Sequence, residues 1–161
     1  MLFRSEDGGE PNNWRSNFGG SVWTELPDGR WYFHTFSKKQ PDLNWENPKL
    51  REKIYEMINW WLEKGVAGFR VDAITFIKKD LTFASRETED GHRYPIENLT
   101  DYPGIGDFLA EMKEKCFDLH ECMTVAEAPG VGEETFRGYA GEHGDFSRIF
   151  DFTWESMEGE A

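Results

Sequence analysis

The sequence is poor in cysteine, in basic residues and in long apolar runs, and each shortage excludes a class of protein. Two cysteines among 161 residues are too few for a disulfide-stapled scaffold. The 18 Lys and Arg residues are outnumbered by 31 Asp and Glu residues, which gives a formal net charge of −13. A chain this acidic has no basic surface for nucleic acid or for an anionic membrane. No run of about 18 apolar residues occurs, so no membrane-spanning helix is predicted.

The first residues also lack the features of a secretory signal. No apolar stretch of about 7–15 residues follows the first charged position, Arg4. We therefore expect a cytoplasmic protein in which Cys116 and Cys122 are free thiols. The length suits one domain of about 150 residues, and it is short for a (β/α)8 barrel, which rarely closes below about 200 residues.

Turn and cap residues predict a loop, a β-hairpin and the start of a helix in the first part of the chain. Residues 1–20 are rich in Gly, Asn, Ser and charge and are typical of a loop. The apolar stretch 21–24, the Pro-Asp-Gly turn at 26–30 and the aromatic stretch 31–36 together predict a small β-hairpin. A helix is then expected to begin at Asn47 and Pro48, a good cap followed by a good first helical residue.

The rest of the chain alternates between helices and strands, which indicates an α/β fold. The first helix is expected to end at Gly65 and to bury one face, made of Ile54, Met57, Ile58, Trp61 and Leu62. Residues 68–74 predict a short strand, and residues 80–100 a polar excursion. The following segments predict a helix from Pro103, a strand over 121–127, a weak helix over 133–139 and a third strand over 146–152. Strands separated by helices in this way are expected to be parallel.

Two of these strands end in a carboxylate. Asp72 follows the strand at 68–74, and Glu127 closes the strand at 121–127. In parallel α/β folds the carboxyl ends of the strands meet at the active site, and neighbouring strands lie about 4.8 Å apart. The pair is thus able to flank one glycosidic bond. The alternative is that both acids only cap the turns that follow them.

Arg70 favours the catalytic interpretation. It precedes Asp72 by two positions, so both side chains leave the same face of the strand. A guanidinium holds a carboxylate ionised and oriented, as a nucleophile requires. Glu127 has no such basic residue nearby in the sequence except His120, which predicts a different environment suited to a proton donor. The alternative for Arg70 is a structural ion pair.

Four segments resemble signature regions of glycoside hydrolase family 13, the α-amylase superfamily. Residues 68–74 (GFRVDAI) and 123–130 (MTVAEAPG) resemble two of its regions. Residues 40–44 (QPDLN) and 11–20 (PNNWRSNFGG) are similar to stretches of its oligo-1,6-glucosidase and α-glucosidase branch. The resemblance extends over almost the whole chain. It implies a hydrolase that retains anomeric configuration and cleaves terminal α-glucosidic bonds, α-1,6 or α-1,4, of short oligosaccharides, without a cofactor. The calcium loop of this branch lies upstream of the matched segments, so no metal site is predicted in this chain.

The resemblance also implies a role for individual residues. Asp72 matches the catalytic nucleophile and Glu127 the general acid/base, while Arg70 matches the arginine that binds the nucleophile. The positions expected to line the sugar cleft are Phe18, Phe36, Gln40 and Ala73. A pyranose has an apolar face that stacks on aromatic rings, although Phe18 and Phe36 also suit a hairpin core. In this branch the residue at position 73 correlates with the type of glycosidic bond that is cleaved, and Ala at this position weakens a strict α-1,6 assignment.

The same resemblance implies a partial (β/α)8 barrel. Residues 1–36 match the end of the small β-rich domain inserted in the family's barrel, and residues 37–161 match about strands 4 to 6 with their helices. The family's third catalytic Asp, in an Asn-His-Asp motif, and its histidine motif are absent from the sequence. We therefore expect an internal piece of the enzyme, inactive alone, which self-associates through open sheet edges.

Two kinds of alternative function stay open on the sequence. Trehalose-6-phosphate hydrolysis and sucrose isomerisation belong to the same family and share the segment at 40–44. A non-catalytic interaction protein on the same scaffold is the alternative from another class. The joint presence of Arg70, Asp72 and Glu127 argues against it, because a scaffold without chemistry has no need of paired carboxylates and an arginine.

Overall fold

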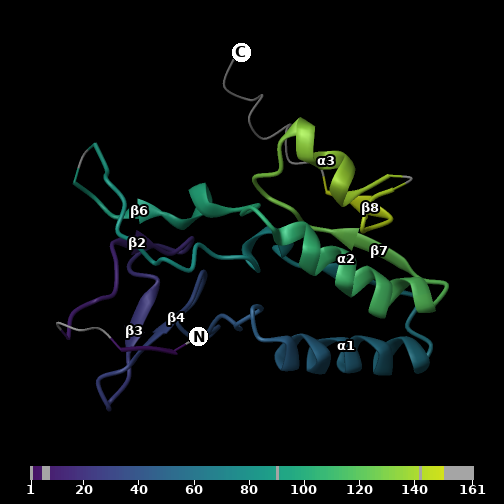
Figure 1. Ribbon diagram of the computed structural model, residues 1–161, viewed down its shortest axis with the longest axis horizontal. Coiled ribbons are helices and arrows are strands. Elements are labelled where there is room, and N and C mark those ends of the chain that lie inside the picture. The colour runs from purple at the N-terminus through teal and green to yellow at the C-terminus, as the bar shows by residue number, and fades with distance from the viewer. Residues whose placement is uncertain (1, 5–7, 90, 142, 151–161) are drawn as a thin grey trace.

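The computed structural model describes residues 2–4, 8–89, 91–141 and 143–150. These residues form two regions that lie side by side (Figure 1). One region is built from short strands near the N-terminus, and the other from two long helices and a parallel sheet. No helix among the described residues is long and apolar enough to cross a membrane.

The N-terminal region contains the predicted hairpin. Strands β3 (Trp23–Glu25) and β4 (Trp31–Phe33) pair antiparallel, and β1 (Leu2–Phe3) adds to the far edge of β4. The turn between them is closed by the amide of Leu26, which donates to the carbonyl of Arg30 at 2.7 Å. The hairpin is therefore confirmed, with shorter strands than the sequence predicts.

A segment of the polar excursion completes this region. Strand β6 (Tyr94–Pro95) pairs in parallel with β2 (Trp14–Arg15), although the paired residues are 80 positions apart in the chain. A 3-10 turn, η2 (Ile96–Leu99), follows β6 directly. The excursion also supplies rings to the local core, whose buried members are Trp14, Val22, Trp23, Phe33, Phe76, Phe83 and Ile96. Several of these rings meet edge to face, as Trp23 and Phe33 do at 5.0 Å between centroids.

The second region begins with the helix that the sequence predicts. Helix α1 (Pro48–Glu63) starts after Asn47, whose side chain accepts a hydrogen bond from the amide of Lys49. The turn at Gly65, where φ is +92°, ends it. Its inner face buries Tyr55, Ile58 and Leu62. Met57 and Trp61, predicted on that face, are instead 49% and 44% exposed, because no described element covers that side of the helix.

Three parallel strands form the sheet of this region, in the order β5-β7-β8. Strand β5 (Gly68–Val71) pairs with β7 (Met123–Ala126), and β7 pairs with β8 (Arg148–Ile149). All three strands lie within the predicted segments, and positions 151 and 152 of the third lie outside the described residues. The parallel α/β arrangement is thus confirmed.

Helices connect these strands and cover the sheet. Helix α2 (Ile105–Lys115) buries Ile105, Phe108, Leu109 and Met112, the face that the sequence predicts. It runs beside α1 (Figure 1), and Glu111 joins them by accepting hydrogen bonds from Arg51 and Tyr55. Helix α3 (Glu133–Tyr139) precedes β8, while the 3-10 turns η1 (Ile74–Phe76) and η3 (Phe117–Leu119) flank β5 and α2.

Both cysteines are free thiols in the second region. Cys116 is fully buried behind α2, and burial raises its pKa to about 11. Burial also raises the pKa of Cys122. A thiol with a raised pKa is a poor nucleophile, so both side chains act as small apolar core residues.

Candidate active site

The two strand-ending carboxylates stand opposite one another. Arg70 pairs with Val125 and Val71 with Ala126 in the β5–β7 ladder, so Asp72 and Glu127 occupy the next facing positions. Backbone hydrogen bonds continue the ladder there: Glu127 donates its amide to Val71, and Ile74 donates its amide to Glu127, both at 2.9 Å. The backbones that carry both acids are therefore held side by side at the carboxyl end of the sheet.

Arg70 forms an ion pair with each of these carboxylates. Its Nη1 lies 3.0 Å from Asp72 Oδ1, and its Nη2 contacts Glu127 Oε2. The expectation that Glu127 lacks a basic neighbour is therefore wrong, because the neighbour comes from the adjacent strand rather than from the sequence before it. What distinguishes the two acids is exposure: the side chain of Asp72 is 71% exposed, and that of Glu127 is 24% exposed.

Ala73 turns the chain immediately after Asp72. Its φ of 44° and ψ of 41° are left-handed, which is uncommon for a residue with a side chain. The buried turn η1 follows, and the hydroxyl of Thr75 donates to the carbonyl of Pro129 at 2.8 Å. This bond joins the segment after Asp72 to the segment after Glu127. The two halves of the site are therefore held together both by the backbone hydrogen bonds of the ladder and by this side-chain hydrogen bond.

Both acids open onto one cleft of about 540 Å³. The volume lies within the range of about 300–1,000 Å³ that small-molecule sites occupy. Phe18, Phe36, Gln40 and Ala73 line the same cleft, so the structure brings together every predicted site residue except Arg70, which contacts both acids without lining it. The further lining residues are Asn17, Phe76, Glu97, Thr100, Pro129 and Gly130.

The aromatic wall of the cleft comes from the N-terminal region. Phe18 is 73% exposed, and its ring centroid lies 5.6 Å from that of Phe36. Phe36 in turn packs edge-on against Phe76 at 5.3 Å. Phe18 is therefore not part of the hairpin core, whereas Phe36 contributes both to that core and to the cleft.

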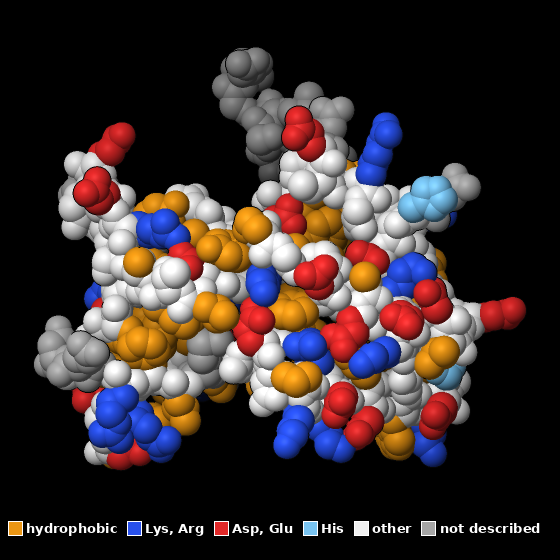
Figure 2. All heavy atoms as spheres, in the orientation of Figure 1, with side chains coloured by type: hydrophobic (Ala, Val, Ile, Leu, Met, Phe, Trp, Pro, Cys, Tyr) orange, Lys and Arg blue, Asp and Glu red, His pale blue; other side chains and the backbone are white. Residues whose placement is uncertain are grey.

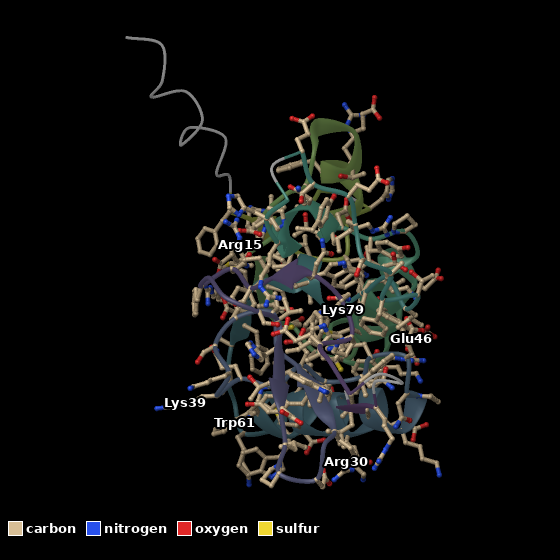
Figure 3. All side chains as sticks on the ribbon, turned by 90° about the vertical axis from the view of Figure 1, so that its left-hand side faces the viewer. Arg15, Arg30, Lys39, Glu46, Trp61 and Lys79 are labelled. Atoms are coloured by element: carbon tan, nitrogen blue, oxygen red, sulfur yellow. The ribbon has the colours of Figure 1, made fainter. Side chains whose placement is uncertain are left out.

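A buried ion pair fixes the wall behind Gln40. Asp42 accepts hydrogen bonds from the amide and the hydroxyl of Thr35, at 2.8 and 2.6 Å. Lys79 reaches Asp42 at 2.7 Å from the second region, and Figure 3 shows it in the interior of the molecule. Burial lowers the pKa of Lys79, and the nearby carboxylate of Asp42 opposes that change. A smaller pocket of about 240 Å³ between Lys79 and Asp72 adjoins the cleft.

The residues that sequence reasoning missed come mainly from the excursion at 80–100 and from the turn after Glu127. Glu97 and Thr100 carry no motif, and only the pairing of β6 with β2 brings them to the cleft. Gly130 has a φ of +81°, and a Cβ there would lie 2.1 Å from the hydroxyl of Thr100. Among the described residues, no group of three His, Cys, Asp or Glu side chains is placed to hold a metal ion.

Comparison with known proteins assigns the family. The model of the α-amylase catalytic domain matches residues 3–161. This chain belongs to the α-amylase family, glycoside hydrolase family 13. It is 49% identical over 151 residues to an oligo-1,6-glucosidase of Halalkalibacterium halodurans, a match that covers 91% of this chain and 27% of that protein. The chain thus spans about a quarter of the length of the relatives it matches.

Solved structures of the family superpose on most of the chain. Trehalose-6-phosphate hydrolase of Bacillus licheniformis matches with a TM-score of 0.84 at 35% identity, over 95% of this chain and 27% of that one. Trehalulose synthase of Pseudomonas mesoacidophila matches with a TM-score of 0.83 at 35% identity, over 94% of this chain and 28% of that one. Relatives of the predicted glucosidase branch and of both predicted sibling activities are therefore similar to this chain.

Proposed function

We propose that this chain carries the nucleophile and the acid/base of a retaining α-glucosidase that acts on short oligosaccharides. The observation that supports this best is the placement of Asp72 and Glu127 at facing ends of two parallel strands, on one cleft and on one arginine. Retaining glycosidases need two carboxyl groups that flank the anomeric centre of the sugar. The oligo-1,6-glucosidase relative favours a substrate of this class.

In the proposed mechanism, Asp72 attacks the anomeric carbon while Glu127 gives a proton to the oxygen of the leaving sugar. The bond from that carbon to the leaving oxygen breaks, and a covalent glucosyl ester on Asp72 results. Glu127 then takes a proton from water, whose oxygen attacks the same carbon and releases Asp72. Arg70 orients Asp72, since a guanidinium held by two carboxylates has little freedom of its own.

The cleft walls would bind the sugar rings. Phe18 and Phe36 offer apolar surfaces to a pyranose, and Gln40 offers an amide to its hydroxyl groups. Ala73 places only a methyl group beside the nucleophile, which leaves room for more than one linkage. We propose further that residues 1–36 end the inserted β-rich domain, and that β5, β7 and β8 correspond to strands 4, 5 and 6 of the family barrel.

Hydrolysis of p-nitrophenyl α-glucoside tests the assignment, with Asp107→Asn as a matched control on the outer part of α2. In a polypeptide extended to the length of the relatives, we expect Asp72→Asn to lower kcat by about a thousandfold or more, which is ~4 kcal/mol of transition-state stabilisation. Asp107→Asn should keep full activity. An Asp72→Asn enzyme with more than a tenth of the parent's kcat would refute the assignment of Asp72 as the nucleophile.

The chain by itself should show no turnover above that of its Asp72→Asn variant. Retaining glycosidases also depend on distortion of the sugar and on hydrogen bonds to its hydroxyls, and the motifs that supply these in the family are absent from the sequence. Turnover by the chain that Asp72→Asn abolishes would show that the described residues complete a working site without further parts.

A further inference from the structure

Every charged side chain that lines the cleft is a carboxylate. Asp72 and Glu127 come from the parallel sheet, and Glu97 comes from the opposite wall. Arg70 is the cation nearest to the two catalytic acids, and both of its ion pairs are made with them. No Lys, Arg or His of the described chain lines the cleft to balance a further negative charge on a ligand.

Glu97 does have a cationic partner, but that partner faces elsewhere. Arg15 Nη2 lies 3.4 Å from Glu97 Oε1, and the two side chains are 45% and 44% exposed. Arg15 lines a separate groove of about 690 Å³, together with His92, Arg93 and Tyr94, and does not line the cleft. The ion pair is therefore a dipole whose negative end faces the cleft and whose positive end faces the neighbouring groove.

The backbone holds this dipole in place from both sides. Arg15 and Pro95 are partners in the β2–β6 ladder, and Glu97 follows two residues after Pro95. Ile96 beside it is 2% exposed and anchors the turn in the aromatic core. The carbonyl of Glu97 accepts a hydrogen bond from the hydroxyl of Thr100 at 3.1 Å. The backbone position of Glu97 is thus set by strand pairing and by the anchored turn, which directs this residue to the cleft.

We infer that Glu97 is a specificity-determining residue, which makes the cleft accept uncharged glucosides and reject those whose second sugar carries a phosphate. This inference rests on the proposed function, because it concerns the ligand of the same cleft. A phosphate ester carries about −1.5 to −2 charges at neutral pH. Brought within reach of a carboxylate and offered no cation, it is repelled, whereas a neutral sugar hydroxyl donates a hydrogen bond to that same carboxylate.

Binding of trehalose and of trehalose 6-phosphate to the chain tests the inference, since the two ligands differ only in the phosphate. Titrations followed by NMR chemical shifts give the two dissociation constants at millimolar concentrations. We expect the parent chain to bind trehalose at least about tenfold more tightly than its phosphate ester. The preference is measured as the dissociation constant of trehalose 6-phosphate divided by that of trehalose. This ratio should fall at high salt, because the Debye length falls from about 10 Å at 0.1 M to about 3 Å at 1 M.

Glu97→Gln keeps the shape of the side chain and removes its charge. We expect the ratio of the two dissociation constants to fall by about tenfold in this variant, because Arg15 then becomes an unbalanced cation beside the cleft. The double variant Arg15→Gln/Glu97→Gln should lie between the parent and the single variant. Glu25→Gln, at an exposed position in β3, is the matched control and should leave the ratio at the parent value.

The outcomes separate this inference from the proposed function. Equal binding of the two ligands by the parent chain, or an unchanged ratio in Glu97→Gln, overturns the role of Glu97 and leaves the catalytic assignment standing. Failure of the parent to bind either ligand counts against the proposed sugar cleft itself, and the inference falls with it. A lowered ratio in Glu25→Gln as well would show a general effect of net charge and would also overturn the role of Glu97.

Discussion

The two regions of the molecule build their cores in different ways. The N-terminal region packs aromatic rings edge to face, and Trp14, Trp23 and Phe33 are no more than 3% exposed. The region of the parallel sheet packs mainly aliphatic side chains, and α1 leaves Met57, Trp60 and Trp61 between 44% and 50% exposed. Figure 2 shows apolar side chains gathered over the N-terminal strands and a mixed charged surface over α1 and α2.

The difference follows from how each kind of sheet is closed. An antiparallel hairpin finds its partner strand within a few residues, and the excursion at 80–100 covers its rings. A parallel sheet needs a helix for every new strand, and within the described residues β5 and β8 each pair on one side only. Strands β1 and β3 are edges too, but their sheet keeps a covered aromatic core, so we expect the parallel sheet to be the one whose edges further chain or another molecule covers.

Lys79→Met is the change that should disturb both regions most. Asp42 of the first region would keep its buried charge without the cation that the second region supplies, which costs about 3–5 kcal/mol. Urea unfolding followed by tryptophan fluorescence measures the loss. Lys49→Met, at an exposed position in α1, should change the free energy of unfolding by less than about 0.5 kcal/mol.

The double variant Lys79→Met/Asp42→Asn sharpens this test. Removal of both charges replaces an ion pair with neutral groups, so much of the stability should return. A double variant as unstable as Lys79→Met would show that the lysine stem, rather than the charge balance, joins the two regions.

Gly68→Ala should damage the second region alone. A Cβ at position 68 would lie 1.8 Å from the carbonyl oxygen of Met123, so β5 and β7 would have to move apart. We expect a loss of about 3 kcal/mol, with faster amide hydrogen exchange in β5 and β7 and little change in β3 and β4. Gly106→Ala is the control: it lies in α2 with nothing within 4 Å and should stabilise the helix by about 1 kcal/mol. Normal protection of β7 in Gly68→Ala would contradict this expectation.

Self-association should depend on the second region, and here the expected effect is smallest. The sequence predicts association through open sheet edges, and we expect the exposed side chains of α1 to be covered with them; Figure 3 shows Trp61 at the outer edge of the molecule. Sedimentation velocity at micromolar concentrations should give a mass above that of a monomer, and Trp60→Glu should lower the mass. Leu81→Glu, with an equally exposed side chain in the excursion, should not. A monomer at every concentration would refute the prediction.

Local signals in the sequence predicted much of this fold. The Asn47-Pro48 start of α1, the turn of the hairpin and the acids that end β5 and β7 all depend on near neighbours in the chain. The second contact of Arg70 was not predicted, because Glu127 reaches it across a strand pair. The position of Glu97 at the cleft was not predicted for the same reason, since only the β2–β6 pairing brings it there. The exposure of Met57 and Trp61 was not predicted either, because periodicity identifies an apolar helix face but not which other element covers it.

The parallel pairing of β5 and β7 also determines when the site comes into being. The hydrogen bond from Thr75 to Pro129 joins residues 54 positions apart, and closure of a loop that long costs about 3.5 kcal/mol of chain entropy. At a synthesis rate of about 5–20 residues per second, Asp72 leaves the ribosome about 3 to 11 s before Glu127 does. During that interval the nascent β5 lacks β7, its partner among the described residues, so the pairing of Asp72 with Glu127 is a late product of folding.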